Sequence, residues 1–442
     1  MTKRIIIMGA AGRDFHNFNV LYRTDKSTLV VAFTATQIPF IENRVYPASL
    51  AGALYPQGVP IVPEAALPEL IKKERVDEAV FSYSDVPHAY IMERAALCAS
   101  LDVDFTLLGA QKTMLKSGKP VISVCATRTG CGKSGVTRFV AGTLKEAGLR
   151  PVAIRHPMPY GNLEAQSVQR FASEADMLKA DCTIEEMEEY AHLVKSGVVV
   201  YAGVDYAEIL KAAEAEADVI IWDGGNNDTP FLKPDLALTV ADPLRPGHEN
   251  EYFHGNVNLR IADAVVINKV GGAPIEGIEA IIKNVKAVNP SAKIIKTASV
   301  VTVASAIVGK KVLVVEDGPT LTHGGMAYGA GMVAARRHRA VAVDPRPYAI
   351  GSIRAALDKY PRLENLLPAM GYSDEQKREL EETINNVPCD AVLIATPVDL
   401  AAIIKIKHKT VRVNYDVHDA DTAERAQGLY TLITDFANRL KK

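Results

Sequence analysis

One stretch of the chain has the residue types and the spacing of a phosphate-binding loop: residues 127–134 read TRTGCGKS. Its two glycines let backbone N–H groups wrap around phosphate oxygens, and the helix predicted after it adds partial positive charge. Lys133 can bridge the β- and γ-phosphates of a nucleotide, and the Ser134 hydroxyl can ligate Mg²⁺. The standard pattern has a glycine where this chain has Thr127. We predict a nucleotide–Mg²⁺ site here.

A phosphate loop also needs an acid at the end of a neighbouring strand. The apolar run 219–222 delivers Asp223 to the carboxyl end of a predicted strand, where ligands bind in parallel sheets. Asp223 is therefore our candidate for holding Mg²⁺, directly or through water. A turn aspartate that caps a loop is the alternative interpretation.

The nucleotide base has a candidate element of its own. Asn268 and Lys269 resemble the start of the NKxD element of GTPases, but Gly271 stands where the aspartate would accept hydrogen bonds from guanine. Without that acceptor, guanine selectivity loses its usual source, so we expect ATP rather than GTP. The residues predicted to bind the nucleotide are Arg128, Thr129, Gly130, Cys131, Gly132, Lys133, Ser134, Gly135, Asn268 and Lys269.

Three further loops combine Arg, His, Tyr and Gly after predicted strands: residues 155–161, 242–249 and 320–331. Arginine makes bidentate phosphate contacts, and glycine permits close approach of the backbone. Together these loops suit a small, highly anionic ligand, although any one Arg or His of this kind is more often a solvated or structural residue.

Residues 183–190 begin an acidic helix. Thr183 and Glu186 have the spacing of a capping box, and the simplest interpretation is a well-capped helix facing solvent. A catalytic or metal-binding carboxylate among Glu185, Glu186 and Glu189 is the alternative.

The N-terminal residues 4–19 resemble the opening of a Rossmann-like unit with an incomplete GxGxxG pattern. The second predicted strand, 29–33, lacks the following acid that binds a ribose 2′-hydroxyl, which argues against a nicotinamide dehydrogenase. Arg13, His16 and Asn17 follow the glycines and could hold a phosphorylated or carboxylated ligand. A purely structural turn is the alternative for each.

Short Val- and Ile-rich runs alternate with helical patterns along most of the chain, which predicts α/β domains with mainly parallel sheets. We expect a Rossmann-like N-terminal domain at 1–112, a P-loop nucleotide-binding domain at 118–345 and a C-terminal α/β extension at 346–442. The clearest helical patterns are 133–146, 206–215, 275–288, 375–385 and 420–440.

The composition is that of a globular protein. The 442 residues include 52 acidic and 50 basic ones, so binding to nucleic acid through net charge is not expected. The five cysteines are scattered and form no CxxC pair, which fits a reducing cytoplasm. We find no secretory signal and no apolar run long enough to span a membrane.

Several long motifs resemble the cyclic 2,3-diphosphoglycerate synthetase family, and the resemblance covers nearly the whole chain. Bacterial relatives of unknown role, often called GTPases, share these motifs, so the resemblance does not define the substrate. The motifs are GAAGRDFHNFN, RTGCGKSGVTR, RHPMPYG, VADPLRPGHE, EDGPTLTHGGMAYGAG, VDPRPY and IATPVDL.

The resemblance implies a reaction in which ATP closes 2,3-diphosphoglycerate into its cyclic phosphoanhydride and releases ADP and phosphate. It implies catalytic roles for Lys133, Arg155, His156, Asp223, Arg245 and His248. Substrate contacts would come from Arg13, His16, Asn17, Tyr160, His323, Gly324 and Gly325. The partner is then a small anionic phosphorylated molecule, and a homodimer is compatible with the sequence. The alternatives are a related kinase or ligase for another phosphorylated acid, and a GTPase-type switch.

Overall fold

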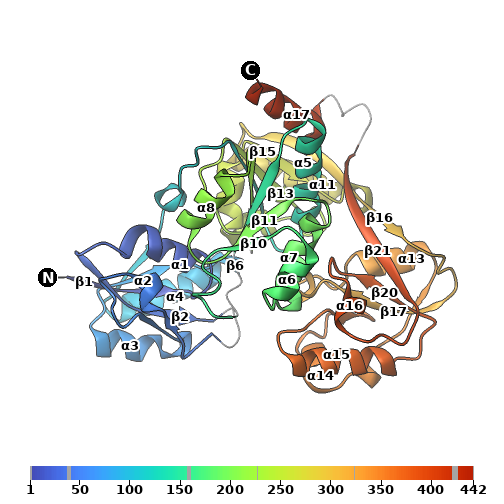
Figure 1. Ribbon diagram of the computed structural model, residues 1–442, viewed down its shortest axis with the longest axis horizontal. Coiled ribbons are helices and arrows are strands. Elements are labelled where there is room, and N and C mark those ends of the chain that lie inside the picture. The colour runs from blue at the N-terminus through green and yellow to red at the C-terminus, as the bar shows by residue number, and fades with distance from the viewer. Residues whose placement is uncertain are drawn as a thin grey trace.

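The computed structural model describes residues 2–36, 41–156, 161–225, 227–322, 324–420 and 427–441. Three units follow one another along the longest axis of the molecule, with the N-terminal unit at one end and the C-terminal unit at the other (Figure 1). No helix in the described ranges is long and apolar enough to cross a membrane.

The N-terminal unit contains a six-stranded sheet in the order β3-β4-β2-β1-β5-β7, and its pairs are parallel except for β3 with β4. Its central strand β1 is apolar from Ile5 onward because helices cover both faces, and Ile5, Ile6 and Ile7 are completely buried. A Rossmann-like classification of this unit stays a prediction. The strands are β1 (Lys3–Met8), β2 (Thr28–Ala35), β3 (Val45–Tyr46), β4 (Val59–Pro63), β5 (Glu78–Phe81) and β7 (Asp104–Leu107).

The rest of the chain builds one 13-stranded sheet in the order β10-β11-β9-β12-β8-β13-β15-β16-β21-β20-β17-β18, with β19 beside β17. Most pairs are parallel, as predicted; β10–β11 and β16–β21 are antiparallel. The strands are β8 (Val121–Ala126), β9 (Pro151–Arg155), β10 (Gln169–Phe171), β11 (Val199–Ala202), β12 (Val219–Asp223), β13 (Leu236–Ala241), β15 (Ala264–Ile267), β16 (Lys293–Val303), β17 (Lys311–Glu316), β18 (Val341–Ala342), β19 (Leu367–Pro368), β20 (Ala391–Ala395) and β21 (Thr410–Asp419). The short strands β6 (Val86–Pro87) and β14 (Tyr252–Phe253) pair separately.

The long strands β16 and β21 join the central and C-terminal parts of this sheet (Figure 1). Residues 293–296 of β16 pair with β15, whereas residues 297–303 pair with β21, which runs in the opposite direction. Strand β20 is parallel to the start of β21, and β17 is parallel to β20. The strands of the C-terminal part therefore point back toward the central part, and the carboxyl ends of both parts face each other across β16 and β21.

The sheet does not break at 345/346, where we expected a boundary. Strands β17 and β18 precede that point, yet β17 pairs with β19 and β20, which follow it. Sequence patterns mark a Pro-rich turn well, but they do not show which strands hydrogen-bond across it.

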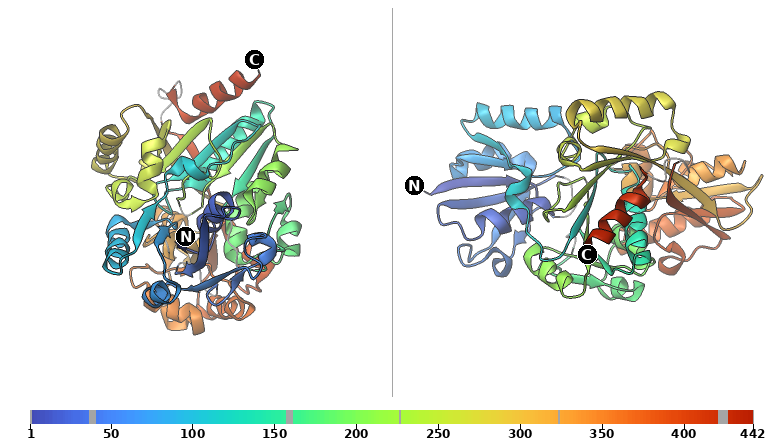
Figure 2. Two further views of the ribbon diagram at one scale, coloured as in Figure 1. Left: turned by 90° about the vertical axis from the view of Figure 1, so that its left-hand side faces the viewer. Right: turned by 90° about the horizontal axis from the view of Figure 1, so that it is seen from above.

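Helices cover both faces of the large sheet. Alternate residues of β15 explain this: Val265 and Ile267 pack with α11, whereas Val266 faces the larger core that contains α5 and α17. Figure 2 shows α11 on one side of the sheet and α17 on the other. The helices are α1 (Arg13–Asn17), α2 (Ala48–Ala51), α3 (Leu67–Glu74), α4 (His88–Ser100), α5 (Lys133–Glu146), α6 (Glu174–Lys179), α7 (Ile184–Val194), α8 (Tyr206–Glu214), α9 (His248–Glu251), α10 (Gly255–Ile261), α11 (Ile275–Val288), α12 (Gly318–Thr322), α13 (Ala330–Arg337), α14 (Gly351–Lys359), α15 (Asp374–Asn386), α16 (Leu400–Ile403) and α17 (Leu429–Leu440).

The last predicted helix is shorter than expected. We predicted 420–440, but α17 begins at Leu429; residues 421–426 lie outside the described part of the chain. The Asp419 carboxylate accepts hydrogen bonds from the backbone N–H groups of Leu429 (2.7 Å) and Tyr430 (3.2 Å). This long-range cap satisfies free donors at the start of the helix.

Candidate active site

A cavity of about 350 Å³ lies where the carboxyl ends of the two parts of the large sheet meet. The central part contributes the phosphate loop after β8, Arg155 at the end of β9 and Lys269 after β15. The C-terminal part contributes Glu316 at the end of β17 and Ala395 at the end of β20. The middle of the β16–β21 pair forms the wall between them. Ligands of parallel sheets bind at such carboxyl ends.

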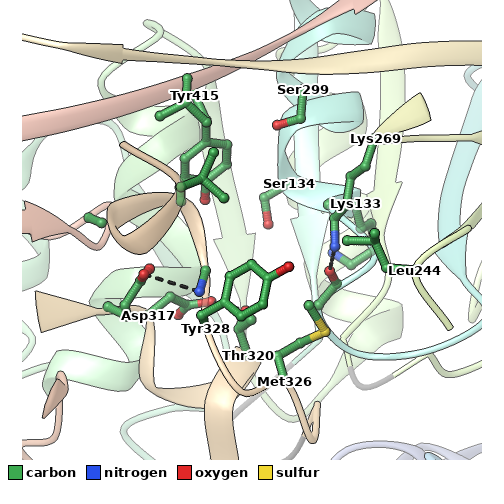
Figure 3. Close-up of a pocket in the computed structure, with 18 of the residues that line it drawn as sticks. Lys133, Ser134, Leu244, Lys269, Ser299, Asp317, Thr320, Met326, Tyr328 and Tyr415 are labelled. Atoms are coloured by element: carbon green, nitrogen blue, oxygen red, sulfur yellow. Dashed lines mark hydrogen bonds between the residues drawn. The ribbon is translucent and has the colours of Figure 1, made fainter. Parts of the chain in front are cut away.

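The phosphate loop connects β8 to α5, as predicted, and lines the cavity with Thr129, Gly130, Gly132, Lys133 and Ser134. Two of these positions need glycine, because φ is +85° at Gly130 and +90° at Gly132. Figure 3 shows Lys133 and Ser134 in the wall of the cavity.

Two predicted loop residues lie behind this wall. Cys131 is buried, and its carbonyl oxygen accepts a hydrogen bond from Nδ2 of Asn268 (3.2 Å). Gly135 is packed against Val417 of β21. Neither belongs to the described lining of the cavity, so both support the shape of the loop.

Asp223 is completely buried beneath the loop and forms ion pairs with two basic side chains. Its Oδ1 lies 2.6 Å from Nζ of Lys133, and its Oδ2 lies 2.6 Å from Nη1 of Arg155. The Thr137 hydroxyl donates to Oδ1 at 2.9 Å. Burial alone would raise the pKa of Asp223, but the charges of Arg155 and Lys133 lower it below its ordinary value. Burial and the Arg155 charge lower the pKa of Lys133 to about 8.

Of the two predicted Mg²⁺ ligands, only Ser134 belongs to the described lining of the cavity, so a Mg²⁺ ion bound here would take most of its ligands from phosphates and water. Ser134 offers a hydroxyl at the cavity, and Asp223 is a carboxylate beneath it, engaged by cations on both oxygens. No group of three His, Cys, Asp or Glu side chains in the described ranges could hold a metal alone. Mg²⁺ is commonly bound through one or two protein ligands together with substrate phosphates.

Arg245 and Lys269 hold the phosphate loop in place through hydrogen bonds to backbone oxygens. Arg245 donates to the carbonyl oxygens of Thr129 (2.9 Å) and Gly324 (2.6 Å), and Lys269 donates to that of Gly130 (2.5 Å). Both cations also contact Asp242. We expected Arg245 to contact substrate phosphate, but the structure places it behind the loop, outside the described lining of the cavity.

Arg128 connects the loop to the N-terminal unit. Its Nε lies 2.9 Å from Oδ1 of Asp85, and its guanidinium carbon lies 3.7 Å from the centre of the Tyr252 ring. Its Nη1 lies 3.3 Å from Nδ1 of His248, whose pKa is lowered by burial and by the Arg128 charge. His248 therefore lies against Arg128 rather than in the described lining of the cavity.

The predicted substrate residues of the N-terminal unit lie elsewhere. Arg13 donates to both oxygens of Thr229, and its guanidinium carbon lies 4.6 Å from the centre of the Phe231 ring. His16 stacks on Phe231, and burial lowers its pKa to about 3. Asn17 donates to the Ser82 hydroxyl (3.0 Å).

Arg13 and His16 thus lie at the contact between the N-terminal and central units, whereas Asn17 is buried within the N-terminal unit; none of the three belongs to the described cavity wall. The other predicted residues also lie at separate places around the cavity. His156 pairs with Asp228 (2.7 Å) behind the site. Gly324 and Gly325 adjoin the lining without belonging to it, whereas Tyr160 and His323 lie outside the described residues.

The opposite side of the cavity is acidic, which the sequence analysis only partly anticipated. The capping box of Thr183 and Glu186 is confirmed, but α7 is a buried helix and not a solvated one. Glu189 on α7 lines the cavity and pairs with Arg155.

Glu316 and Asp317 at the end of β17 were missed as site residues, although both were in a motif that we singled out. Glu316 accepts hydrogen bonds from the N–H groups of Gly329 (3.1 Å) and Met332 (2.9 Å), and burial raises its pKa to about 7. Their position after a buried strand was the available signal.

A comparison with curated proteins shows that this chain is 54% identical to Arginine synthetase ArcE of Thermococcus kodakarensis over 420 residues, which are 94% of each protein. Two proteins named Cyclic 2,3-diphosphoglycerate synthetase are more distant. The one from Thermococcus sibiricus is 26% identical over 55% of this chain and 59% of its own length; the one from Pyrococcus furiosus is 23% identical over 56% and 63%.

A scan against protein-family models found no match. Among solved structures, LpxK from Aquifex aeolicus in complex with ATP matches with a TM-score of 0.42 and 15% identity, over 85% of this chain and 98% of that one. A similarity at this level supports no argument about function.

The curated relatives bear on two predictions. All three are named as synthetases, so the prediction of an ATP-dependent enzyme of this type is confirmed. The family resemblance is confirmed in its broader form, but the match over 94% of the chain is to a protein with a different name from the one expected. With 54% identity over nearly its whole length, this chain belongs to the family of Arginine synthetase ArcE.

Proposed function

We propose that this protein synthesises arginine by completing a guanidinium group at the expense of ATP. The observation that carries the proposal is the match to Arginine synthetase ArcE across 94% of both chains. The geometry supports the proposal. The phosphate loop lines one side of the cavity, and the opposite side is acidic and leaves room for a second substrate.

The chemistry follows from the product. The guanidinium carbon of arginine carries three nitrogens, and its direct oxygen analogue is a ureido group. The γ-phosphoryl group passes from ATP to the ureido oxygen, ammonia attacks the ureido carbon, and the carbon–oxygen bond breaks with release of phosphate. ATP, a ureido amino acid and ammonia thus become arginine, ADP and phosphate.

The residues of the central part would serve the nucleotide. Lys133 and the backbone of the loop hold the β- and γ-phosphates, and Asp223 orients Lys133. When bound, Mg²⁺ neutralises phosphate charge next to Ser134. Arg155 ends β9 between the loop and the acidic wall, where it can stabilise charge on the transferred phosphoryl group.

Cyclic 2,3-diphosphoglycerate synthesis is the second candidate, and the shared motifs and the two distant relatives favour it. It is the weaker candidate because a doubly phosphorylated substrate needs several cations. Arg13, His156 and Arg245, which the resemblance assigned to this task, contact other protein groups.

One experiment separates the candidates. The enzyme is incubated with ATP, Mg²⁺, ¹⁵N-ammonium and citrulline, a ureido amino acid, and mass spectrometry follows ¹⁵N into arginine. A parallel reaction contains 2,3-diphosphoglycerate and is followed by ³¹P resonance. We expect ¹⁵N-arginine with one ADP per product, and no product from Lys133→Ala. A cyclic phosphoanhydride without labelled arginine would overturn the proposal.

A further inference from the structure

Asn268 is our predicted contact for the nucleotide base, but protein groups engage both ends of its side-chain amide. Its Nδ2 donates to the Cys131 carbonyl oxygen (3.2 Å), and its Oδ1 accepts from the Thr297 hydroxyl (3.0 Å). The side chain is 1% exposed and lies outside the described lining of the cavity. The base of a bound nucleotide therefore needs other groups to recognise it.

The long strand β16 has a free edge beyond the end of β15. Strand β15 pairs with one edge of β16 up to Lys296, and β21 pairs with the opposite edge from Thr297 to Val303. In the described ranges no strand continues on the β15 side past Lys296. An edge of this kind presents backbone N–H and C=O groups that need partners.

The register with β21 determines which backbone groups point toward this free edge. The N–H of Ala420 donates to the carbonyl oxygen of Lys296 (3.1 Å), and bonded pairs alternate with non-bonded pairs in an antiparallel ladder. Even-numbered residues of β16 thus bond to β21. The C=O of Ser299 and the N–H of Val301 point away from it. The Val301 carbonyl oxygen agrees with this parity, because it accepts from Nη1 of Arg337 on α13 (3.0 Å), outside the ladder.

The free edge forms part of the cavity wall. Four consecutive residues of β16, from Ala298 to Val301, line the cavity. Consecutive side chains of a strand point to opposite faces, so the cavity meets the strand at its edge and not at one face. Figure 3 shows Ser299 in the same part of the cavity as Ser134 and Lys269.

The turn after β15 connects the phosphate loop to this edge. Lys269 donates to the carbonyl oxygen of Gly130, and a Cβ added at Gly271 would lie 3.7 Å from Cβ of Ala298. Because residue 271 has no side chain, space remains between the turn and β16. Leu244 also lines the cavity, so apolar surface is available for the face of a flat ring.

We propose that the free edge of β16 recognises the adenine of ATP. The Ser299 carbonyl oxygen accepts from the 6-amino group, and the Val301 N–H donates to ring N1. Guanine and hypoxanthine have a carbonyl oxygen at position 6 and an N–H at position 1, so they would set acceptor against acceptor and donor against donor. The proposal rests on the ATP dependence of the proposed function and not on the identity of the second substrate.

The first test measures binding to the wild-type protein by calorimetry, with Mg²⁺ and without a second substrate. The probes are ATP, ITP, whose base is hypoxanthine, and inorganic tripolyphosphate, which has no base. We expect ITP to bind roughly ten- to a hundredfold more weakly than ATP, because two hydrogen bonds are lost and their protein groups stay unpaired. Equal affinity for ATP and ITP would overturn the proposal.

Val301→Pro locates the recognition. Proline removes an N–H that points away from β21, so no hydrogen bond of the ladder is lost. The affinity for ATP should fall more than that for ITP, and the ratio of the two should narrow at least threefold, whereas tripolyphosphate binding stays within twofold. Val303→Pro is the matched control: the Val303 N–H also points away from β21, but the residue lies outside the described lining. Its ratio should equal that of the wild type.

Gly271→Leu is a second variant that leaves β16 unchanged. Its side chain would fill the space beside Ala298 and should weaken ATP at least tenfold without changing tripolyphosphate binding. A wild-type ratio of ATP to ITP affinity in Val301→Pro, or unchanged ATP affinity in Gly271→Leu, would overturn the proposal. A preference for ATP that depends on Val301, in a protein that makes no labelled arginine, would retain the base site and reject the proposed function.

Discussion

Replacing Asp223 with asparagine tests how the phosphate loop is held. The substitution keeps the shape of the side chain and removes its charge. In the native protein this completely buried carboxylate contacts Nζ of Lys133 and Nη1 of Arg155, each at 2.6 Å, and accepts from Thr137. An amide has one acceptor oxygen, so it satisfies at most part of this arrangement.

The expected loss of stability follows from these contacts. Removing one partner of a buried ion pair costs about 3–5 kcal/mol, because the other charge is left uncompensated. Lys133 can relieve part of that cost by losing its proton, since burial and Arg155 already lower its pKa to about 8. We therefore expect about 3 kcal/mol. The loss should be smaller with saturating ATP, whose phosphates supply negative charge next to Lys133.

Urea unfolding can be followed through Trp222, which is the only tryptophan of the sequence, is completely buried and precedes Asp223. Thr137→Val is the control, because it removes the hydrogen bond to Asp223 and leaves every charge in place; we expect about 1 kcal/mol. A loss below about 1 kcal/mol for Asp223→Asn, or the same loss with and without ATP, would refute this reasoning.

Four other outcomes are expected. Gly132→Ala should weaken ATP binding at least tenfold in calorimetry, because the new Cβ would lie 2.3 Å from Nδ2 of Asn268; unchanged affinity would show that the loop can shift. ATP affinity should fall as pH rises above about 8, because Lys133 then loses its charge in the free protein, and Lys133→Met should flatten this profile. ATP should bind more tightly than GTP, since Gly271 replaces the guanine acceptor, and tenfold tighter GTP binding would contradict this. Arg13→Ala should lower the free energy of unfolding by roughly 2–3 kcal/mol and leave ATP affinity unchanged; substrate-specific weakening with normal stability would restore its predicted role.

Local features of the site could be predicted from the sequence. The strand before the phosphate loop, the start of α5 at Lys133 and the capping box at Thr183 depend on residues within a few positions of one another. Asp223 at the end of β12 follows from the same logic, because an apolar run and its next polar residue define a strand end. Short-range sterics and hydrogen bonding determine such features, so they can be predicted from the amino-acid sequence.

The partners of the charged side chains depend on tertiary structure. Arg245 and Arg13 have the residue type of phosphate ligands, yet backbone oxygens of Thr129 and Thr229 accept their hydrogen bonds. Glu188 resembles a solvated helix residue in the sequence, and only the packing of α7 against the C-terminal part buries it beside Asp317.

The sequence by itself determined the nucleotide side of this protein: a phosphate loop, its acid and the α/β class. Only the tertiary structure decided the other side of the cavity. Strands β16 and β21 run antiparallel, so they turn the C-terminal strands back and bring Asp317 opposite Lys133. These residues are far apart in sequence, and their effect depends on distance, burial and neighbouring charge. Those quantities arise only when the sheet has formed.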